Sequence, residues 1–269
     1  MELVQARSIL SPATGFILRG GFEWTCNPYI GCTFGCRYCY AMYLPQNRRP
    51  REEWGRWFQA KANAVELARR QAPRAAGQAV YMASVTDPYQ PVERVLRLTR
   101  GILEALLPHQ PRLVVQTRGP LVTRDADLLR QFESVRVNVS IPTDDEEIRL
   151  AFEPKAPPLE ARWQAVRALK DHGIPVGLCL TPLLPVTDVA AFATKVAQVS
   201  RQKHKLAVED DWAYPYFFNY LQISPSYRLA HLVQQGRIDP NTHKLPQDFD
   251  EVQRTYAAFG SVYRTAFQE

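Results

Sequence analysis

The chain has 269 residues, of which 46% are hydrophobic and 22% are charged, so it can bury the core of one large α/β domain or of two smaller ones. No apolar run approaches the ~20 residues that a membrane-spanning helix needs, and residues 1–7 lack the layout of a signal peptide. We therefore expect no membrane partner and a cytoplasmic location. The net charge of +6 permits an anionic partner, but solubility alone favours a charge of this size.

Strand and helix signals alternate along most of the chain. After a lead-in at residues 1–21, which its glycines and Pro12 suggest is irregular, the first strand is predicted near 22–27. Further strands are predicted at the short apolar runs 79–85, 113–117, 135–141 and 176–181. Apolar residues at helical spacing predict helices at 57–71, 94–107, 124–132, 159–172 and 189–199, with Gly173 just past the end of the fourth. This order predicts parallel βαβ units with right-handed crossovers.

Polar residues in the predicted strands and directly after them indicate how the sheet is curved. They alternate with apolar neighbours, at Ser84 and Thr86, Gln116 and Arg118, Asn138 and Ser140, and Cys179 and Thr181. Parallel strands that are covered by helices on both faces should be apolar throughout. One face is therefore expected to pack helices, while the other encloses a polar cavity with a site at the carboxyl ends of the strands, as in barrels.

Three of the five cysteines fall within eight residues, at Cys32, Cys36 and Cys39. Thiolates this close together in a short loop are poorly placed to bridge one another but well placed to hold one metal centre. A structural zinc site normally has four protein ligands in two separated pairs, so zinc would need Cys26 or a histidine as well. A four-iron, four-sulfur (4Fe–4S) cluster fits three cysteines better and leaves one iron open for chemistry. An odd number of cysteines does not suggest a secreted disulfide framework.

The Cys-x3-Cys-x2-Cys spacing followed by Tyr40 resembles the cluster loop of radical S-adenosylmethionine (SAM) enzymes. The segments 27–31 and 83–91 are similar to those of the spore photoproduct lyase-like branch, and the resemblance runs from 22 to 185. It implies a partial (β/α)6 barrel of the TIM type, with the cluster loop after the first strand. It also implies a 4Fe–4S cluster whose open iron binds SAM, and reductive cleavage of SAM to a 5′-deoxyadenosyl radical that takes a hydrogen atom from a substrate.

The resemblance also assigns site residues at the matching positions. Cys32, Cys36 and Cys39 are the expected metal ligands, and Tyr40 stands where an aromatic residue contacts the adenine of SAM. The expected SAM pocket comprises Tyr40, Ser84, Thr86, Asp87, Arg118 and Ser140. Arg118 falls where the lyase has a lysine on the SAM carboxylate, and Ser140 falls on a serine near the ribose.

One departure from the lyase concerns the final hydrogen donor. Ser84 lies in the stretch where the lyase carries a cysteine that returns a hydrogen atom to the product radical. An O–H bond is much stronger than an S–H bond, so a serine cannot take over that donation. A substrate other than the photoproduct is therefore expected.

Several candidates keep two interpretations. Tyr38 and Tyr40 match tyrosines that are thought to relay a hydrogen atom in the lyase, or they shield the cluster from water and oxygen. Cys179 is either a hydrogen-atom donor or a plain lining residue of the cavity. Cys26 is either a buried small hydrophobe or a thiol near the cavity. The segment 153–157 is also similar to the family, although an exposed turn is its simplest interpretation.

The sequence after residue 185 does not resemble the corresponding part of the family. Six aromatic residues in the nine positions 212–220 could stack nucleobases or could close the end of the barrel, and the acidic residues 209–211 favour closure. Residues 249–259 are predicted to form a helix that packs on the core. The expected division is a lead-in at 1–21, a barrel core at 22–205 and a C-terminal helical and aromatic cap at 206–269.

Three functions follow from these observations. The first is a radical SAM enzyme, a lyase or another radical catalyst, that acts on an unidentified substrate and is reduced by a donor such as flavodoxin or ferredoxin. The second narrows the substrate to a DNA photoproduct or another nucleic-acid lesion. The third is a non-catalytic zinc-binding or nucleic-acid-binding protein, in which Cys26 joins the three clustered cysteines.

Overall fold

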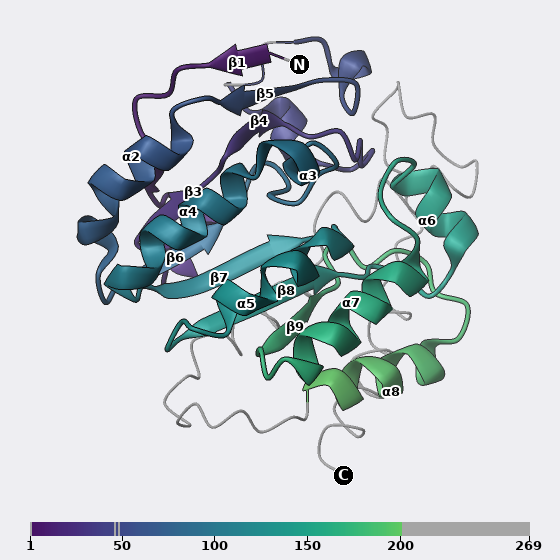
Figure 1. Cartoon of the computed structure of the whole chain (residues 1–269). Coiled ribbons are helices and arrows are strands. Elements are labelled where there is room, and N and C mark those ends of the chain that lie inside the picture. Colours follow the sequence, from purple (N-terminus) through teal and green to yellow (C-terminus); the bar gives the residue numbers. More distant parts are fainter. Residues whose placement is uncertain (1, 46, 48, 201–269) are drawn as a thin grey trace.

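The computed structural model describes residues 2–45, 47 and 49–200, and within them the chain forms two sheets (Figure 1). The small sheet has the order β1-β5-β4, and the large sheet has the order β2-β3-β6-β7-β8-β9. The strands are β1 Glu2–Val4, β2 Leu10–Pro12, β3 Trp24–Cys26, β4 Tyr29–Gly31, β5 Phe58–Lys61, β6 Ala79–Met82, β7 Arg112–Thr117, β8 Val135–Ser140 and β9 Val176–Cys179.

The large sheet is the parallel sheet that the sequence predicts. Strands β3, β6, β7, β8 and β9 are each parallel to their neighbours in this order, and β2 runs antiparallel to β3 at one edge. Helical segments connect each pair from β3 to β9, which gives the alternating strand and helix order of a mixed α/β fold. The described residues thus contain five parallel strands of the predicted (β/α)6 arrangement.

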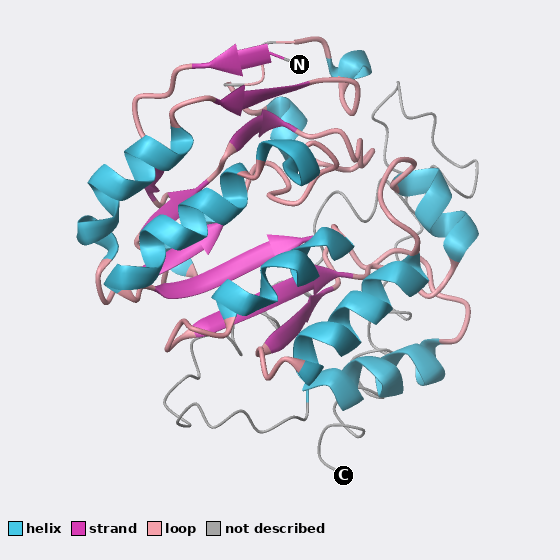
Figure 2. Cartoon of the chain, in the orientation of Figure 1, coloured by secondary structure: helices cyan, strands magenta, loops and turns pink. Residues whose placement is uncertain are grey.

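Helices cover one face of the large sheet (Figure 2). The helices are α1 Gly15–Arg19, α2 Ala64–Gln71, α3 Glu93–Leu96, α4 Leu98–Leu106, α5 Ala126–Leu129, α6 Glu146–Phe152, α7 Leu159–Asp171 and α8 Val189–Ser200. Helix α7 ends as predicted, because Gly173 adopts a φ of 73° and its N–H donates to the carbonyl of Lys170 at 2.8 Å.

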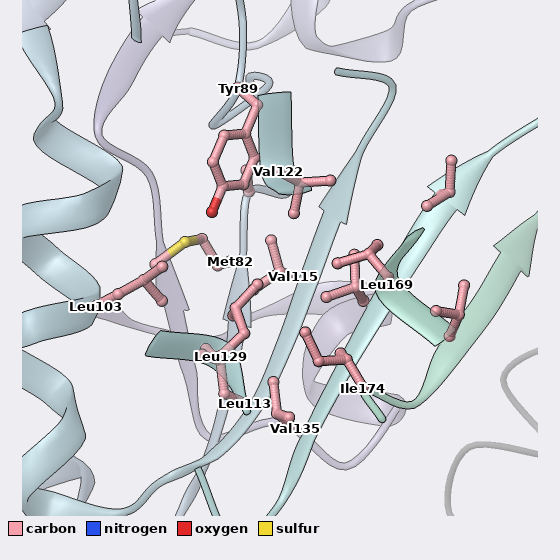
Figure 3. Packing of buried hydrophobic residues seen from close by; sticks show 14 of the residues in the cluster. Met82, Tyr89, Leu103, Leu113, Val115, Val122, Leu129, Val135, Leu169 and Ile174 are labelled. Carbon is pink, nitrogen blue, oxygen red and sulfur yellow. The ribbon is translucent and has the colours of Figure 1, made fainter. Parts of the chain in front are cut away.

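The core lies between the sheet and the helices α2, α4, α5, α7 and α8. Alternate strand residues such as Met82, Val115 and Val137 are fully buried in it, together with Leu103 of α4 and Leu169 of α7 (Figure 3). Fully burying an aliphatic side chain of this kind contributes about 1.5–3 kcal/mol relative to leaving it exposed. This face of the sheet is apolar, as the strand pattern predicts.

The opposite face of the sheet has two parts. Near the amino ends of the strands, Ile17 of α1 and Phe22 pack on Tyr81 and Val114, so the lead-in covers this part of the face. Toward the carboxyl ends, polar side chains line an open space, which is described below. The sheet therefore has two faces and encloses a cavity, as expected, but apolar side chains contribute more of the cavity lining than the predicted polar ones.

The lead-in and the first predicted helix differ from the sequence prediction. Residues 2–19 are not irregular, since they supply β1, β2 and α1. Residues 58–61, predicted as the start of a helix, form β5, which pairs with β1 on one side and with β4 on the other. Two-sided pairing satisfies the backbone of β5, and this tertiary context overrides the helical spacing of its side chains.

The predicted helix 94–107 is broken at Arg97, which has a φ of 52°. The carboxylate of Glu93 accepts hydrogen bonds from the N–H groups of Thr99 (3.0 Å) and Arg100 (3.4 Å), and so caps the start of α4. The break turns Val95 outward, where it is 78% exposed, although its spacing predicts an inward position.

Two other predicted elements are shorter than expected. The strand 79–85 ends at Met82, because Ala83 adopts a φ of 74° and turns the chain into a loop. Most of the predicted helix 124–132 is divided between the 3₁₀ helix η5, Pro120–Asp125, and the short helix α5. In addition, α6 was not predicted; its start is capped by Asp145, whose carboxylate accepts from the N–H of Glu147 at 2.7 Å.

The predicted cap lies outside the described residues. This applies to the aromatic segment 212–220, to the helix 249–259 and to the proposed boundary between 205 and 206. The division of the chain into three parts thus remains a prediction. Across the described part of the chain, no helix has the length and apolarity that crossing a membrane requires.

Candidate functional site

A cavity of about 350 Å³ opens on the inner face of the large sheet, toward the carboxyl ends of its strands. The loop of residues 32–39, which we call the cluster loop, forms one wall, and the loop after β6 and strands β7 to β9 form the others. The predicted site residues that line the cavity are Cys32, Cys36, Cys39, Tyr38, Tyr40, Ser84, Thr86, Asp87, Arg118 and Cys179. Segments far apart in the sequence are thus brought to one place.

The cluster loop follows β4 directly and is braced from several sides. Thr33 donates through its N–H (3.0 Å) and its hydroxyl (3.2 Å) to the side-chain oxygen of Gln90, which is fully buried. The N–H of Arg37 donates to the carbonyl of Phe152 at the end of α6, at 2.9 Å. These bonds fix the backbone that carries the three thiols.

Two glycines let a second segment touch the cluster loop. A Cβ atom built on Gly55 would lie only 2.5 Å from the Cα atom of Gly35, so any larger residue at position 55 would collide with the loop. Gly55 also has a φ of 83°, which residues with side chains rarely adopt. The side chain of Lys155 donates to the carbonyl of Gly55 at 2.7 Å and holds this segment in place.

The three thiols are close enough to influence one another. Burial raises the pKa of Cys32 well above its usual value, and the neighbouring Asp87 and Cys36 raise it further. Burial raises the pKa of Cys36 to about 12, although Arg118 acts in the opposite direction. Burial also raises the pKa of Cys39. The free thiols are therefore protonated near neutral pH, and a metal centre that binds them as thiolates must displace their protons.

The two tyrosines next to Cys39 have different surroundings. The hydroxyl of Tyr38 donates to the carboxylate of Glu153 and accepts from Arg118 at 2.9 Å. Tyr40 is 40% exposed, and its hydroxyl donates to the backbone carbonyl of Ser84. Tyr38 therefore belongs to a buried ionic group, whereas Tyr40 links the cluster loop to the loop after β6.

The loop after β6 uses its polar side chains mainly to hold its own shape. The hydroxyl of Thr86 donates to the carbonyl of Gly31, just before the cluster loop, at 2.6 Å. The carboxylate of Asp87 accepts from the hydroxyl of Thr117 (2.6 Å) and from the N–H groups of Arg118 (2.7 Å) and Tyr89 (2.9 Å). The N–H of Val85 donates to the side chain of Asn27 at 3.2 Å. These contacts place the loop against β7 and beside the thiols.

Arg118 reaches from the end of β7 into a buried group of charges. Its Nε donates to Glu153 at 2.7 Å, and Glu153 also contacts the guanidinium of Arg162 at 2.5 Å. We call Tyr38, Arg118, Glu153 and Arg162 the cavity-side network. Burial alone would raise the pKa of Glu153, but Arg118 and then Arg162 lower it from 4.5 to about 2, so this carboxylate is charged.

Cys179 lies on the inner face of β9. The side-chain N–H of Gln116 on β7 donates to its sulfur at 3.0 Å, and the oxygen of Gln116 accepts from the hydroxyl of Tyr81 on β6. All three residues line the cavity. The thiol is thus held within the space that the cluster loop borders.

Two residues lie apart from the cavity. Ser140, predicted to contact SAM, is 1% exposed and is not part of the lining; its Oγ has no hydrogen-bond partner among the described residues, and its carbonyl accepts from Arg162 at 2.9 Å. Cys26, the suggested fourth zinc ligand, is completely buried in the core on the helix-facing side. Within residues 2–45, 47 and 49–200, no three His, Cys, Asp or Glu side chains are grouped around the position of one metal ion. The cysteines of a 4Fe–4S cluster each bind a different iron, so they do not need such a grouping.

Sequence reasoning missed Glu153, Arg162 and the bracing by Gln90. The segment 153–157 does form a turn in which Pro154 and Lys155 are exposed, but Glu153 itself is completely buried, directly after the end of α6. One signal was present for Arg162: it lies three residues after Leu159 and four before Val166, on the apolar face of α7. A charge at such a position is almost always paired.

Comparison with known proteins places this geometry in context. The chain is 28% identical to an uncharacterized protein of Methanocaldococcus jannaschii over 217 residues, which cover 80% of this chain and 77% of that protein. It is 35% identical to an uncharacterized protein of Acidianus two-tailed virus over 179 residues, which cover 62% of this chain and 58% of the viral protein. It is also 31% identical to an uncharacterized protein of Mycobacterium tuberculosis. That match covers 62% of this chain and about half (52%) of the mycobacterial protein.

Solved structures share the fold. A spore photoproduct lyase variant matches with a TM-score of 0.61 and 14% identity over 98% of this chain and 79% of that one. Another variant of spore photoproduct lyase, with bound SAM and a dinucleoside spore photoproduct, matches with a TM-score of 0.60 and 14% identity over the same shares. At this identity the likeness concerns the fold.

The donor set of the cavity fits the cofactors that this fold accommodates. Three thiols from one loop meet a cavity in which Arg118 offers a guanidinium, and strand ends offer further polar groups. This combination suits a cluster with one open iron and a ligand with a carboxylate. The model of the radical SAM superfamily, whose members use a 4Fe–4S cluster and SAM, matches residues 26–192, and the chain belongs to this superfamily.

Proposed function

We propose that Cys32, Cys36 and Cys39 hold the 4Fe–4S cluster of this radical SAM enzyme and that the cavity beside them receives SAM and the substrate. The observation that carries this assignment is the position of all three thiols on one wall of the cavity, next to the guanidinium of Arg118. When bound, the reduced cluster and SAM supply a 5′-deoxyadenosyl radical, which takes a hydrogen atom from the substrate. The substrate itself is unidentified.

The remaining lining residues shape the SAM pocket. Tyr40 and Ser84, joined by a hydrogen bond, form the part of the rim where adenine would lie. Arg118 uses Nε and Nη2 for Glu153 and Tyr38, which leaves the edge between its two Nη groups for the SAM carboxylate. Thr86 and Asp87 line the cavity and also hold the loop through their oxygens, and both stay candidates for contact with SAM. Ser140 is left out of the proposed pocket.

Cys179 is the proposed final hydrogen donor in place of the missing cysteine near Ser84. Its S–H bond breaks homolytically, the hydrogen atom passes to the carbon radical of the product, and a thiyl radical remains on Cys179. One electron from the reductant and one proton restore the thiol. Support comes from the place of Cys179 in the cavity lining and from Gln116, whose N–H holds the sulfur at 3.0 Å. Tyr38 and Tyr40 stay candidates for relaying the hydrogen atom.

Anaerobic reconstitution with iron and sulfide tests the assignment of the ligands. We expect a brown protein with about four irons that cleaves SAM when dithionite is added. The Cys36→Ala variant should lose both the cluster absorption and the cleavage, whereas Cys26→Ala should keep both. A colourless protein that binds one zinc would contradict the proposal and favour the zinc-binding alternative. The same assay, repeated with nucleic-acid, peptide and small-molecule pools, is the route to the substrate.

A nucleic-acid lesion is the second candidate substrate. It is supported by the net charge of +6 and by the fold shared with a spore photoproduct lyase that binds a dinucleoside spore photoproduct. Binding to irradiated and to plain DNA, measured across a range of salt concentrations, tests it. Tighter binding to irradiated DNA at every salt concentration would support the lesion, and equal binding would favour another substrate.

The family needs a reductant, and we propose a small acidic electron carrier such as flavodoxin or ferredoxin in a cytoplasmic setting. Arg37 in the cluster loop, Arg56 and Lys155 are exposed around the contact between Gly35 and Gly55. Such a basic surface beside the thiols attracts an acidic partner. Replacing these three residues with glutamine should slow reduction by the carrier but not by dithionite. Equal rates with the carrier would contradict this docking surface.

A further inference from the structure

The cavity-side network contains an excess of positive charge that is shielded from water. The side chains of Glu153 and Arg162 are both 0% exposed, and that of Arg118 is 16% exposed. Arg118 and Arg162 both contact the same carboxylate, at 2.7 and 2.5 Å. The ion-paired side chains thus carry two guanidinium charges and one carboxylate charge. Charges in such a place act over a longer range than charges at the surface, because the effective dielectric constant is lower.

This network touches the backbone and the side chains of the cluster loop. Tyr38, between two of the cysteines, bonds to both Glu153 and Arg118. The segment that carries Glu153 is bonded to the loop by the N–H of Arg37, which donates to Phe152 at 2.9 Å. The charges are therefore fixed in position relative to the thiols.

These contacts bring the charges of the cavity-side network close to Cys36. Arg118 and Cys36 line the same cavity, and Tyr38, two residues after Cys36, bonds to both Arg118 and Glu153. Asp87 is the other buried carboxylate nearby, but it bonds to the N–H of Arg118 and not to the guanidinium. A guanidinium in the network thus stabilises negative charge on the loop, and the carboxylate opposes it.

We propose that Arg118, Arg162 and Glu153 are positioning residues that set the reduction potential of the metal centre on the cluster loop. This inference rests on the proposed function. Reduction adds one negative charge to the centre, and the electron comes from the reductant, while no bond in the network forms or breaks. The two guanidinium groups favour the added charge and raise the potential, and Glu153 limits the rise.

Redox titration of the cluster-loaded protein without SAM, followed by absorbance and electron paramagnetic resonance, tests the proposal. Glu153→Gln should shift the potential upward and Arg118→Gln should shift it downward. Each shift should be at least about 59 mV, which corresponds to a tenfold change in a one-electron equilibrium. A purely structural role would not produce opposite shifts in the two variants.

Matched variants keep the test decisive. Glu160 and Arg167 form an exposed ion pair at 2.5 Å, and Glu160→Gln and Arg167→Gln should leave the potential unchanged. Arg118→Lys keeps the charge and should stay near the wild-type potential, so Arg118→Gln and Arg118→Lys decide the matter even if Glu153→Gln does not fold. Shifts in the same direction, or none beyond the exposed controls, overturn the inference. Failure to assemble a 4Fe–4S cluster in the wild-type chain would instead overturn the proposed function.

Discussion

Two buried groups of charged side chains support the chain around the cluster loop, and they differ in balance. The cavity-side network joins two guanidinium groups to the carboxylate of Glu153. The second group lies between α3, α4 and η5, away from the cavity lining, and we call it the helix-side network; its members are Tyr29, Glu93, Arg100, Arg124 and Asp125.

The helix-side network has no excess of positive charge, since its two guanidinium groups meet the buried carboxylates of Glu93 and Asp125, and Arg100 also contacts the exposed Asp127 at 2.8 Å. Arg124 contacts Glu93 at 2.8 Å and Asp125 at 2.7 Å, and Arg100 contacts Asp125 at 3.1 Å. Glu93 also accepts from the hydroxyl of Tyr29, just before the cluster loop. Paired charges of this kind fix the geometry of the helices and of β4. The comparison teaches that an excess of guanidinium charge over carboxylate charge occurs in the network beside the cavity, where an anionic centre is expected.

The largest expected effect comes from removing Glu153. Glu153→Ala leaves Arg118 and Arg162 buried beside each other with like charges, and should cost about 3–5 kcal/mol of unfolding free energy. Urea unfolding of the cluster-free chain measures the loss. Glu160→Ala, in the exposed pair with Arg167, is the matched control and should change the stability little. An equal loss of unfolding free energy in Glu153→Ala and Glu160→Ala would show that the charges of the cavity-side network are not shielded from water.

Acidification should break the same network in the wild-type chain. The pKa of Glu153 is lowered to about 2 from 4.5, so its ionised form contributes stability above pH 4.5 that is lost as the pH falls toward 2. The shift corresponds to about 3 kcal/mol at 1.36 kcal/mol per unit. Unfolding measured from pH 5 to pH 2 should fall less steeply for Glu153→Gln than for the wild type. Parallel curves would contradict the lowered pKa.

Glu93→Gln separates the two networks. The change removes the charge that Arg124, the N–H of Thr99 and the hydroxyl of Tyr29 all contact, and should cost about 1.5–3 kcal/mol. Because the helix-side network does not border the cavity, the reduction potential of the loaded protein should stay at the wild-type value. A potential shift as large as that of Glu153→Gln would remove the distinction between the networks.

The smallest expected effect concerns the backbone contact between Gly55 and Gly35, which supports the cluster loop. Gly55→Ala would place a Cβ atom 2.5 Å from Gly35, and should cost about 1–3 kcal/mol and slow the uptake of iron. Gly77 has a similar φ of 67°, but a Cβ there meets nothing within 4 Å, so Gly77→Ala is the control for backbone strain. Similar iron uptake in the two variants would argue against the contact as a support.

The sheet and the cluster loop could be predicted because their signals are local. Alternation of polar and apolar residues gave the two faces of β7 and β8, and the cysteine spacing gave the loop. The strand β5 could not be predicted, since its pairing partner β1 lies more than fifty residues away in the sequence. The role of Glu153 was missed for the same reason, because Arg118 lies 35 residues before it and only the fold joins them.

The contact between Gly35 and Gly55 limits how the enzyme can be reshaped. The cluster loop cannot move outward on that side, so a cluster, SAM and the substrate would share the cavity of about 350 Å³ that the described residues form. A larger substrate therefore leaves less space for SAM in the cavity. Replacing Phe22 or Tyr81, which line the cavity, with a smaller residue is thus a direct way to admit larger molecules.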